Sequence, residues 1–286
     1  MDALMTENQR SIEAFLLVEN FNQFSPAVTK VSELVSDGVS DAAAIGAVIE
    51  TDALLTVNLL RMANSASMGG LAGVDSVARA VAVMGAGPVR DLCFALGCRD
   101  AFRHMQNDII TMDDFWSHSI YCGVMARELA KVCKGGLDAG AALTAGVLHD
   151  IGRLVMFNQA QELCQSMLVE AMEGEDLDVS KLERKHFGFD HGQVGAELMA
   201  SWKLPKSLQD CAAYHHRPTQ ASGHQELVGL VHAANVLANY VELGDADSTL
   251  IHPKVVEMLG LREVDIEALA ETVREIVVPL LPIFSE

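Results

Sequence analysis

His149 and Asp150 stand side by side near the end of a predicted apolar helix, and both side chains can bind a metal ion. They lie in the segment AALTAGVLHDIGR, residues 141–153, which starts with small apolar residues and reaches Gly152, where we expect the helix to stop. An imidazole and a carboxylate at adjacent positions can bind one divalent ion, with the carboxylate as the harder ligand. Such pairs are common by chance, so the case for a site depends on the other histidines.

The position of His118 suggests that it meets this pair. It lies near the start of a predicted helix over residues 115–133, and a Gly135-Gly136 turn leads into the helix that ends at His149. At ~1.5 Å per residue the chain climbs about 24 Å from residue 118 to 134 and returns about 18 Å from residue 137 to 149. A short turn makes neighbouring helices antiparallel. We therefore expect His118 and the His149-Asp150 pair at the open end of one hairpin.

A second predicted hairpin repeats this arrangement. His191 begins its first helix, Pro205 marks the turn, and His215-His216 end the return helix. Two hairpins with such residues at their open ends can close over a common site. The competing interpretation is a hydrogen-bonded polar network that fixes the hairpins without any ion.

The remaining histidines are assigned a less specific role. A lone histidine on a helix is usually an ordinary polar residue, and we place His104, His186, His224 and His252 in that class. His232 is ambiguous, because it shares one helical face with Asn235 at a spacing of three residues.

The elements that must position these side chains are all predicted to be helices. Half of the residues are hydrophobic but only 5% are aromatic, and a core of Ala, Leu, Val and Met favours helix over sheet. Apolar spacing and capping residues predict helices over residues 11–21, 26–35, 41–50, 52–65, 76–84, 89–96, 115–133, 137–149, 179–186, 191–202, 206–216 and 225–241, followed by two short ones. Ser40 and Thr51 are the predicted caps of the third and fourth. The helix over 52–65 has apolar residues on more than one face, so we expect it to be buried.

No alternating strand pattern and no internal repeat is found. We expect an all-α protein with two lobes, an N-terminal helical bundle over residues 1–105 and a second helical bundle over residues 106–286 that carries the histidines.

Charge and cysteine usage exclude several classes of function. The formal net charge is −19, and no basic patch stands out, so neither nucleic-acid binding nor binding to an anionic membrane is expected. The six cysteines form no CxxC pair, which is typical of reduced thiols. No secretory signal and no stretch of ~20 apolar residues is apparent, so we expect a cytoplasmic protein.

Several segments, in order, resemble the HDOD family, the signalling-output branch of the HD-domain superfamily. The similar segments are DALLTVNLLRMANSA (52–66), FWSHS (115–119), GVLHDIGRL (146–154), GFDHGQVGAELMASWKLP (188–205) and HHRP (215–218). The resemblance spans roughly residues 15–240. It implies an all-helical fold, with an HD-domain-like second lobe, and a regulatory module in bacterial signalling that works through partners rather than by turnover.

The HD-GYP phosphodiesterases are catalytic relatives that cleave cyclic dinucleotides with a metal cluster. Carried over by position, the resemblance implies a metal site at these residues: His118, His149, Asp150, His191, His215, His216 and Asn235. Three departures matter. Arg153 stands where the HDIGK motif has lysine, no GYP tripeptide follows Pro218, and Asn235 stands where HD hydrolases usually place an aspartate. An amide is a neutral and weaker ligand, so we interpret the site as degenerate.

Two functions follow as hypotheses. The first is a non-catalytic signalling adaptor that binds partner proteins and retains a degenerate metal site. The second is a metal-dependent phosphohydrolase for a nucleotide or cyclic dinucleotide, in which Arg153 or Lys185 steadies phosphate charge. Several histidines with one carboxylate suit one or two ions of Fe, Mn, Ni or Zn. The sequence names no partner, assigns no catalytic residue and leaves a homo-oligomer open.

Overall fold

The computed structural model describes residues 12, 13, 16, 25–64, 73–102, 111–173, 179–243 and 250–284. Within these ranges every regular element is helical and no strand occurs, so the all-α prediction is confirmed. The predicted first helix over 11–21 falls mostly outside the described residues, and so does the boundary expected near residue 105.

The first helices begin at side chains that cap them. They are α2 (Pro26–Ser36), α3 (Ala42–Ile49), α4 (Ala53–Ala63) and α5 (Val77–Met84). Asp41 and Asp52 are the caps of α3 and α4, and each accepts hydrogen bonds from backbone N–H groups of the first turn. The prediction of Ser40 and Thr51 as caps is therefore wrong by one residue. Ser40 Oγ instead donates to Asp37, and Thr51 Oγ1 donates to the Val48 carbonyl.

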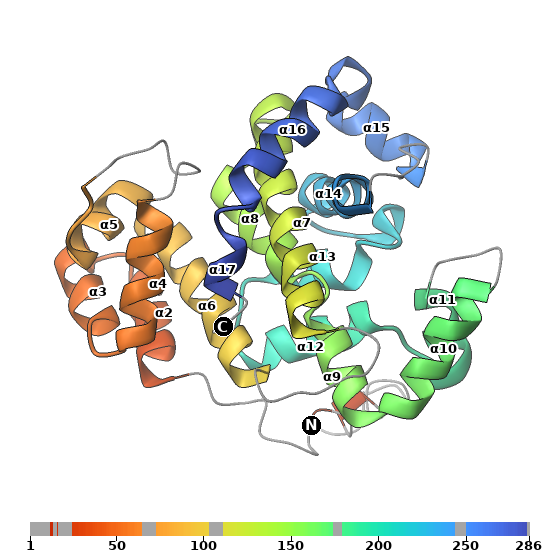
Figure 1. Cartoon of the computed structure of the whole chain (residues 1–286), viewed down its shortest axis with the longest axis horizontal. Coiled ribbons are helices and arrows are strands. Elements are labelled where there is room, and N and C mark those ends of the chain that lie inside the picture. Colours follow the sequence, from red (N-terminus) through yellow and green to blue (C-terminus); the bar gives the residue numbers. More distant parts are fainter. Residues whose placement is uncertain are drawn as a thin grey trace.

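The remaining helices follow in chain order (Figure 1). They are α6 (Ala86–Phe102), α7 (Met112–Val132), α8 (Ala139–Leu148), α9 (Ile151–Gln159), α10 (Gln161–Glu173), α11 (Val179–Phe187), α12 (His191–Ser201), α13 (Lys206–Tyr214), α14 (Gln225–Leu243), α15 (Pro253–Leu259), α16 (Ile266–Val277) and α17 (Leu281–Phe284), with short 3₁₀ turns at Pro218–Gln220 and Leu261–Glu263.

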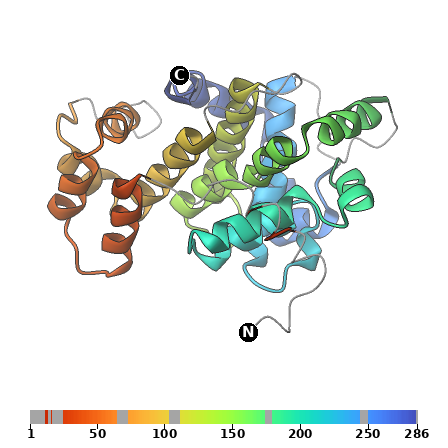
Figure 2. The same ribbon diagram turned by 90° about the horizontal axis from the view of Figure 1, so that it is seen from below.

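Helix α7 is the central element of the fold. It packs against α8, α14, α16 and α17, and its Trp116, Met125 and Leu129 are fully buried. Figures 1 and 2 show α2–α5 grouped at one end of the molecule, with α6 running from that group toward α7 and α8. Buried apolar residues from α2–α6 and from the later helices form one continuous core. The predicted division into two lobes stays a prediction.

One part of the buried-helix prediction is wrong. Helix α4 packs its Leu55 and Leu59 into the core, but Leu54 and Val57 on its other side are 40% and 46% exposed. The apolar residues on more than one face of this helix therefore do not mean that it is enclosed on all sides.

Glycines let the helices that carry the histidines approach closely. A Cβ on Gly146 of α8 would lie 2.6 Å from Gly123 Cα of α7. A Cβ on Gly152 would overlap the backbone oxygen of His191 at the start of α12. Gly152 does not stop a helix as predicted. The chain turns at His149 and Asp150, and Gly152 lies inside α9, where its missing side chain lets α9 pack on α12.

Among the described residues, no single helix combines the length and hydropathy needed to cross a membrane. Helices α5 and α6 reach those values only as a pair, across a bend of 115°.

Candidate metal centre

His149 and Asp150 form the turn between α8 and α9. His149 is the C-cap of α8, and both side chains are buried. His149 Nδ1 donates to the Gly146 carbonyl at 2.7 Å, which leaves Nε2 as the nitrogen with the lone pair. That Nε2 is buried and has no hydrogen-bond partner. A buried acceptor without a donor is costly, so this atom suits a cation.

His191 and His215 are oriented in the same way. His191 begins α12, and its Nδ1 lies 2.6 Å from Oε2 of Glu183, a buried residue of α11 that also accepts the His191 backbone N–H. His215 is the C-cap of α13, and its Nδ1 lies 2.8 Å from the Ala212 carbonyl. In both rings an oxygen holds Nδ1–H and leaves Nε2 to bind, as second partners do for histidines that ligate metals.

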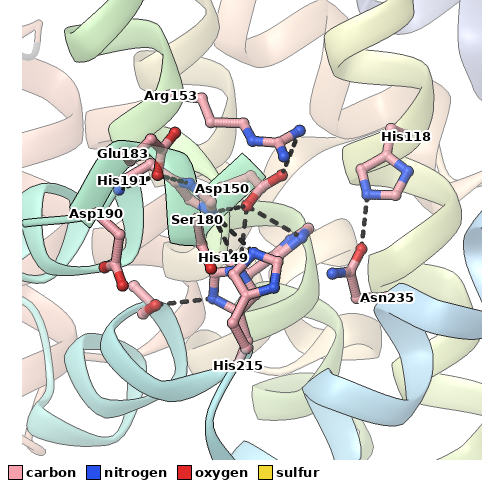
Figure 3. Close-up of polar contacts among 12 residues, drawn as sticks. His118, His149, Asp150, Arg153, Ser180, Glu183, Asp190, His191, His215 and Asn235 are labelled. Atoms are coloured by element: carbon pink, nitrogen blue, oxygen red, sulfur yellow. Dashed lines mark hydrogen bonds and ion pairs between the residues drawn. The ribbon is translucent and has the colours of Figure 1, made fainter. Parts of the chain in front are cut away.

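The Nε2 atoms converge on one carboxylate oxygen. Asp150 Oδ1 lies 3.1 Å from His191 Nε2, 3.3 Å from His215 Nε2 and 3.5 Å from His149 Nε2 (Figure 3). His216 Nε2 lies 3.1 Å from His191 Nε2. Lone pairs facing one another around a carboxylate repel unless a proton or a metal ion lies between them.

Burial and charge divide the protons among these groups unequally. Burial lowers the pKa of His149 to about 3 and holds that of His216 well below its usual range. Burial also opposes the charged form of His191, but Glu183 and Asp150 outweigh it and raise its pKa to about 10. Burial would raise the pKa of Asp150, yet Arg153 and the neighbouring histidines keep it well below the usual value. The cluster thus contains an ionised Asp150 and neutral His149 and His216, with a proton on His191.

His118 extends the cluster from α7. Its ring centroid lies 5.6 Å from that of His149. Its Nδ1 lies 2.8 Å from Glu242 Oε2, and its Nε2 lies 2.9 Å from Asn235 Oδ1, both on α14. Asn235 therefore contacts His118 directly, at the side of the cluster where the resemblance placed the last ligand.

Two overlapping groups of candidate ligands result. In Asp150, His191, His215 and His216 the ligand atoms all lie within 4.8 Å of one another, and the same holds for His118, His149 and Asp150. The prediction that the two hairpins bring these side chains together is confirmed. Their role as metal ligands stays a prediction, but an orphaned buried nitrogen and oriented imidazoles around a carboxylate fit a divalent transition-metal ion.

The two predicted phosphate-binding residues lie in different settings. Arg153 Nη1 lies 3.3 Å from Asp150 Oδ2, at the edge of the cluster, and its side chain is 25% exposed. Lys185 is mostly exposed on α11, where its Nζ lies 3.3 Å from Glu170.

His232 belongs to the structural framework. Its Nδ1 lies 2.7 Å from the His215 carbonyl, and its Nε2 accepts the His252 backbone N–H. It therefore ties the end of α13 to the start of α15.

Sequence reasoning missed the two carboxylates that hold the imidazoles, Glu183 and Glu242. Glu242 follows Asn235 by seven residues, which is two helical turns on the same face, so a signal for it existed. Glu183 has no such signal. Asp190 caps α12 and also binds the guanidinium groups of Arg184 and Arg217.

Comparison with known proteins identifies relatives of this chain. The HDOD domain pattern matches residues 22–218, more than half of the chain. A Geobacter sulfurreducens HDOD domain protein of unknown function is 21% identical, with a TM-score of 0.74 over 97% of each chain. A Shewanella amazonensis protein named as a proposed phosphohydrolase is 21% identical, with a TM-score of 0.74 over 96% of this chain and 98% of that one. At this level of identity these structures establish a shared fold.

Two relatives are longer than this chain. A Marinobacter aquaeolei protein named as a proposed signal transduction protein is 22% identical, with a TM-score of 0.75 over 97% of this chain and 64% of its own. An uncharacterized Treponema pallidum protein is 22% identical over 261 residues, which are 84% of this chain. The chain spans about half the length of that curated relative.

Proposed function

This chain belongs to the HDOD family, and we propose from that premise that it is a signalling output module that acts through partner proteins. In this proposal the histidine cluster holds one or two divalent transition-metal ions for structural or regulatory purposes and does not turn over a substrate.

The observation that carries the proposal is the burial of the candidate ligands. His149, Asp150, His191 and His215 are each no more than 3% exposed. In a metal-dependent hydrolase, a phosphorus atom must reach a water bound to the ion. Ligands this deeply enclosed favour an ion that is shielded from phosphate esters.

The residues around the cluster also fit two ion positions that differ in affinity. Asp150, His191, His215 and His216 would provide one carboxylate and three imidazoles at the first position. At the second position His118 faces Asn235, whose amide oxygen brings no charge, so an ion there would be held more weakly. Asp150, His191 and His215 lie where α8 ends, α12 begins and α13 ends. By holding one divalent ion, these residues would link the three helix ends.

Partner binding in this proposal is assigned to the N-terminal lobe, residues 1–105, and the ion to the second lobe, residues 106–286. The Marinobacter relative, by its name, supports a role in signal transduction. The net charge of −19 favours protein partners over nucleic acid.

The alternative function is a metal-dependent phosphohydrolase acting on a nucleotide or a cyclic dinucleotide. The position of Arg153 favours it, because a partly exposed guanidinium beside Asp150 could bind a phosphate oxygen at the edge of the cluster. The name of the Shewanella relative agrees with this function.

Metal content and turnover, measured on the same preparation, separate the two functions. The protein is purified without chelators, its Fe, Mn, Ni and Zn are quantified, and hydrolysis of bis(p-nitrophenyl) phosphate and of a cyclic dinucleotide is followed with added Mn²⁺. His149→Ala removes a candidate ligand, and His224→Ala, which changes a part-exposed histidine paired with Asp210, is the matched control.

The proposal expects bound metal that is lost in His149→Ala and retained in His224→Ala, without hydrolysis by any form. Hydrolysis by the unmodified protein that disappears in His149→Ala would establish the enzyme instead. Protein without metal after incubation with each ion would remove the metal part of both functions.

A further inference from the structure

A hollow lies between α4, α6 and α17, away from the histidine cluster. Its volume is about 390 Å³, and its lining includes Leu54, Val57, Asn58, Arg61, Arg99 and Pro282. Arg99 of α6 and Pro282 of α17, which is labelled in Figure 1, both line it, so helices far apart in the sequence form its walls. No residue of the candidate metal centre is among those that line it.

One face of α4 provides the apolar wall. Leu54, Val57 and Arg61 are spaced by three and four residues, so they lie on the same side of the helix. Leu54 and Val57 are the exposed apolar residues that the buried-helix prediction did not anticipate. Exposed apolar side chains that line a hollow are a common feature of ligand-binding sites.

The polar atoms of the hollow are mainly donors. Asn58 is 2% exposed, and its Nδ2 has no hydrogen-bond partner although it is buried. Arg61 is exposed and forms no ion pair with another residue of the described chain. Arg99 is almost fully buried, and its Nη2 donates to Asp100 Oδ1 at 3.2 Å. A buried amide that lacks an acceptor loses free energy unless a ligand supplies one.

The charge of this hollow contrasts with that of the whole chain. The protein carries a net charge of −19, yet among the described residues that line the hollow there are two arginines and no carboxylate. Asp100 offsets part of the charge of Arg99, so Arg61 is the main source of positive potential. Donors and a guanidinium beside an apolar wall match an anionic head with an aliphatic tail.

We propose that this hollow binds a small amphipathic anion, a carboxylate or a phosphate monoester joined to a short aliphatic chain. Arg61 and Asn58 Nδ2 bind the anionic oxygens, and Leu54, Val57 and Pro282 cover the tail. Because the hollow lies between α4, α6 and α17, a ligand there links the last described helix to α4 and α6. This inference is independent of whether the histidine cluster binds metal.

Calorimetric titration of the full chain with four compounds tests the proposal. Octanoate and octyl phosphate carry both a charge and a tail, octanol carries only the tail, and inorganic phosphate carries only the charge. Arg61→Gln removes the guanidinium, and Asn58→Leu replaces the unpartnered amide with an apolar side chain of similar size. Arg79→Gln, at an exposed arginine of α5, is the matched control.

The expected result is saturable binding of octanoate, octyl phosphate or both, with octanol and inorganic phosphate each at least tenfold weaker. Arg61→Gln and Asn58→Leu should each weaken that binding, the former about tenfold or more, and Arg79→Gln should leave it unchanged. Preference between octanoate and octyl phosphate identifies the head group.

Three results would overturn the proposal. One is that neither charged compound shows saturable binding at concentrations up to about 1 mM. Another is octanol binding as tightly as octanoate. The third is unchanged affinity in Arg61→Gln, since binding would then lie elsewhere on the protein.

Discussion

Replacing Gly152 with alanine tests whether the contact between α9 and α12 sets the spacing of the candidate ligands. A Cβ at this position would overlap the His191 carbonyl oxygen and lie 2.5 Å from Gly195 N. Both neighbours are backbone atoms, so no side chain can rotate away. A carbon atom needs about 3.5 Å from such neighbours, so α9 and α12 must separate by at least about 1 Å.

The expected cost follows from that separation. Overpacking a well-packed interface usually costs about 1–3 kcal/mol, and rigid backbone neighbours place Gly152→Ala near the upper end. For a chain of this size, about 3 kcal/mol lowers Tm by roughly 6–12 °C. Asp150 lies two residues before Gly152, and the new Cβ would overlap the backbone of His191. The distance of 3.1 Å between Asp150 Oδ1 and His191 Nε2 should therefore increase as well. A ligand displaced by more than about 0.5 Å binds poorly, so divalent-ion affinity should fall at least tenfold.

The assay is thermal unfolding by circular dichroism, together with metal titration of the folded protein. Gly87→Ala is the matched control, because a Cβ on Gly87 in α6 meets nothing within 4 Å. Its Tm should stay the same or rise slightly, since alanine favours the helix. A Gly152→Ala protein with the Tm and metal affinity of the unmodified chain would refute the reasoning.

Three further predictions concern the cluster itself. In Glu183→Gln, a neutral amide holds His191 Nδ1–H less strongly, so the ion affinity measured by titration should fall tenfold to a hundredfold. The circular dichroism spectrum should stay that of the folded helical protein. Equal ion affinity would argue against an orienting role of Glu183. In Asn235→Asp, a new carboxylate beside His118 should raise the number of metal ions per chain measured by elemental analysis, and an unchanged ratio would contradict the weak second position. The pKa of His191 is about 10 in the metal-free protein, above the ordinary 6.5, so at pH 7 an ion must displace its proton. Ion affinity should therefore increase as pH rises from 7 toward 10, with about one proton released per ion. If calorimetry gave the same heat of ion binding in buffers of different ionisation enthalpy, this proton release would be excluded.

The position of the candidate ligands at the open end of each hairpin could be predicted from the sequence, because it depends on helix length and turn position. Helix rise is constant, so His118 and His149 had to lie at similar heights once the Gly135-Gly136 turn was recognised. The identity of Glu183 as the partner of His191 could not be predicted. That contact depends on how α11 is rotated about its axis, which the packing of the whole fold decides.

Two errors in the helix predictions have different causes. The chain turns at His149-Asp150 without proline or glycine at the turn, because the pair is drawn into the cluster, and Gly152 was mistaken for the cause of the turn. Helix α10 was not predicted, although Cys164, Met167 and Ala171 are buried at the spacing of one helical face. In that case the signal was present in the sequence.

Asp150 belongs to both groups of candidate ligands, and this sharing makes their occupancies interdependent. A carboxylate oxygen that gives electron density to one cation has less to give to the next. Two neighbouring cations also repel each other across a few ångströms of protein. Loading would therefore be sequential, with a tight first equivalent and a much looser second one. The charge state of this buried pocket would then follow the concentration of free metal in steps rather than in proportion.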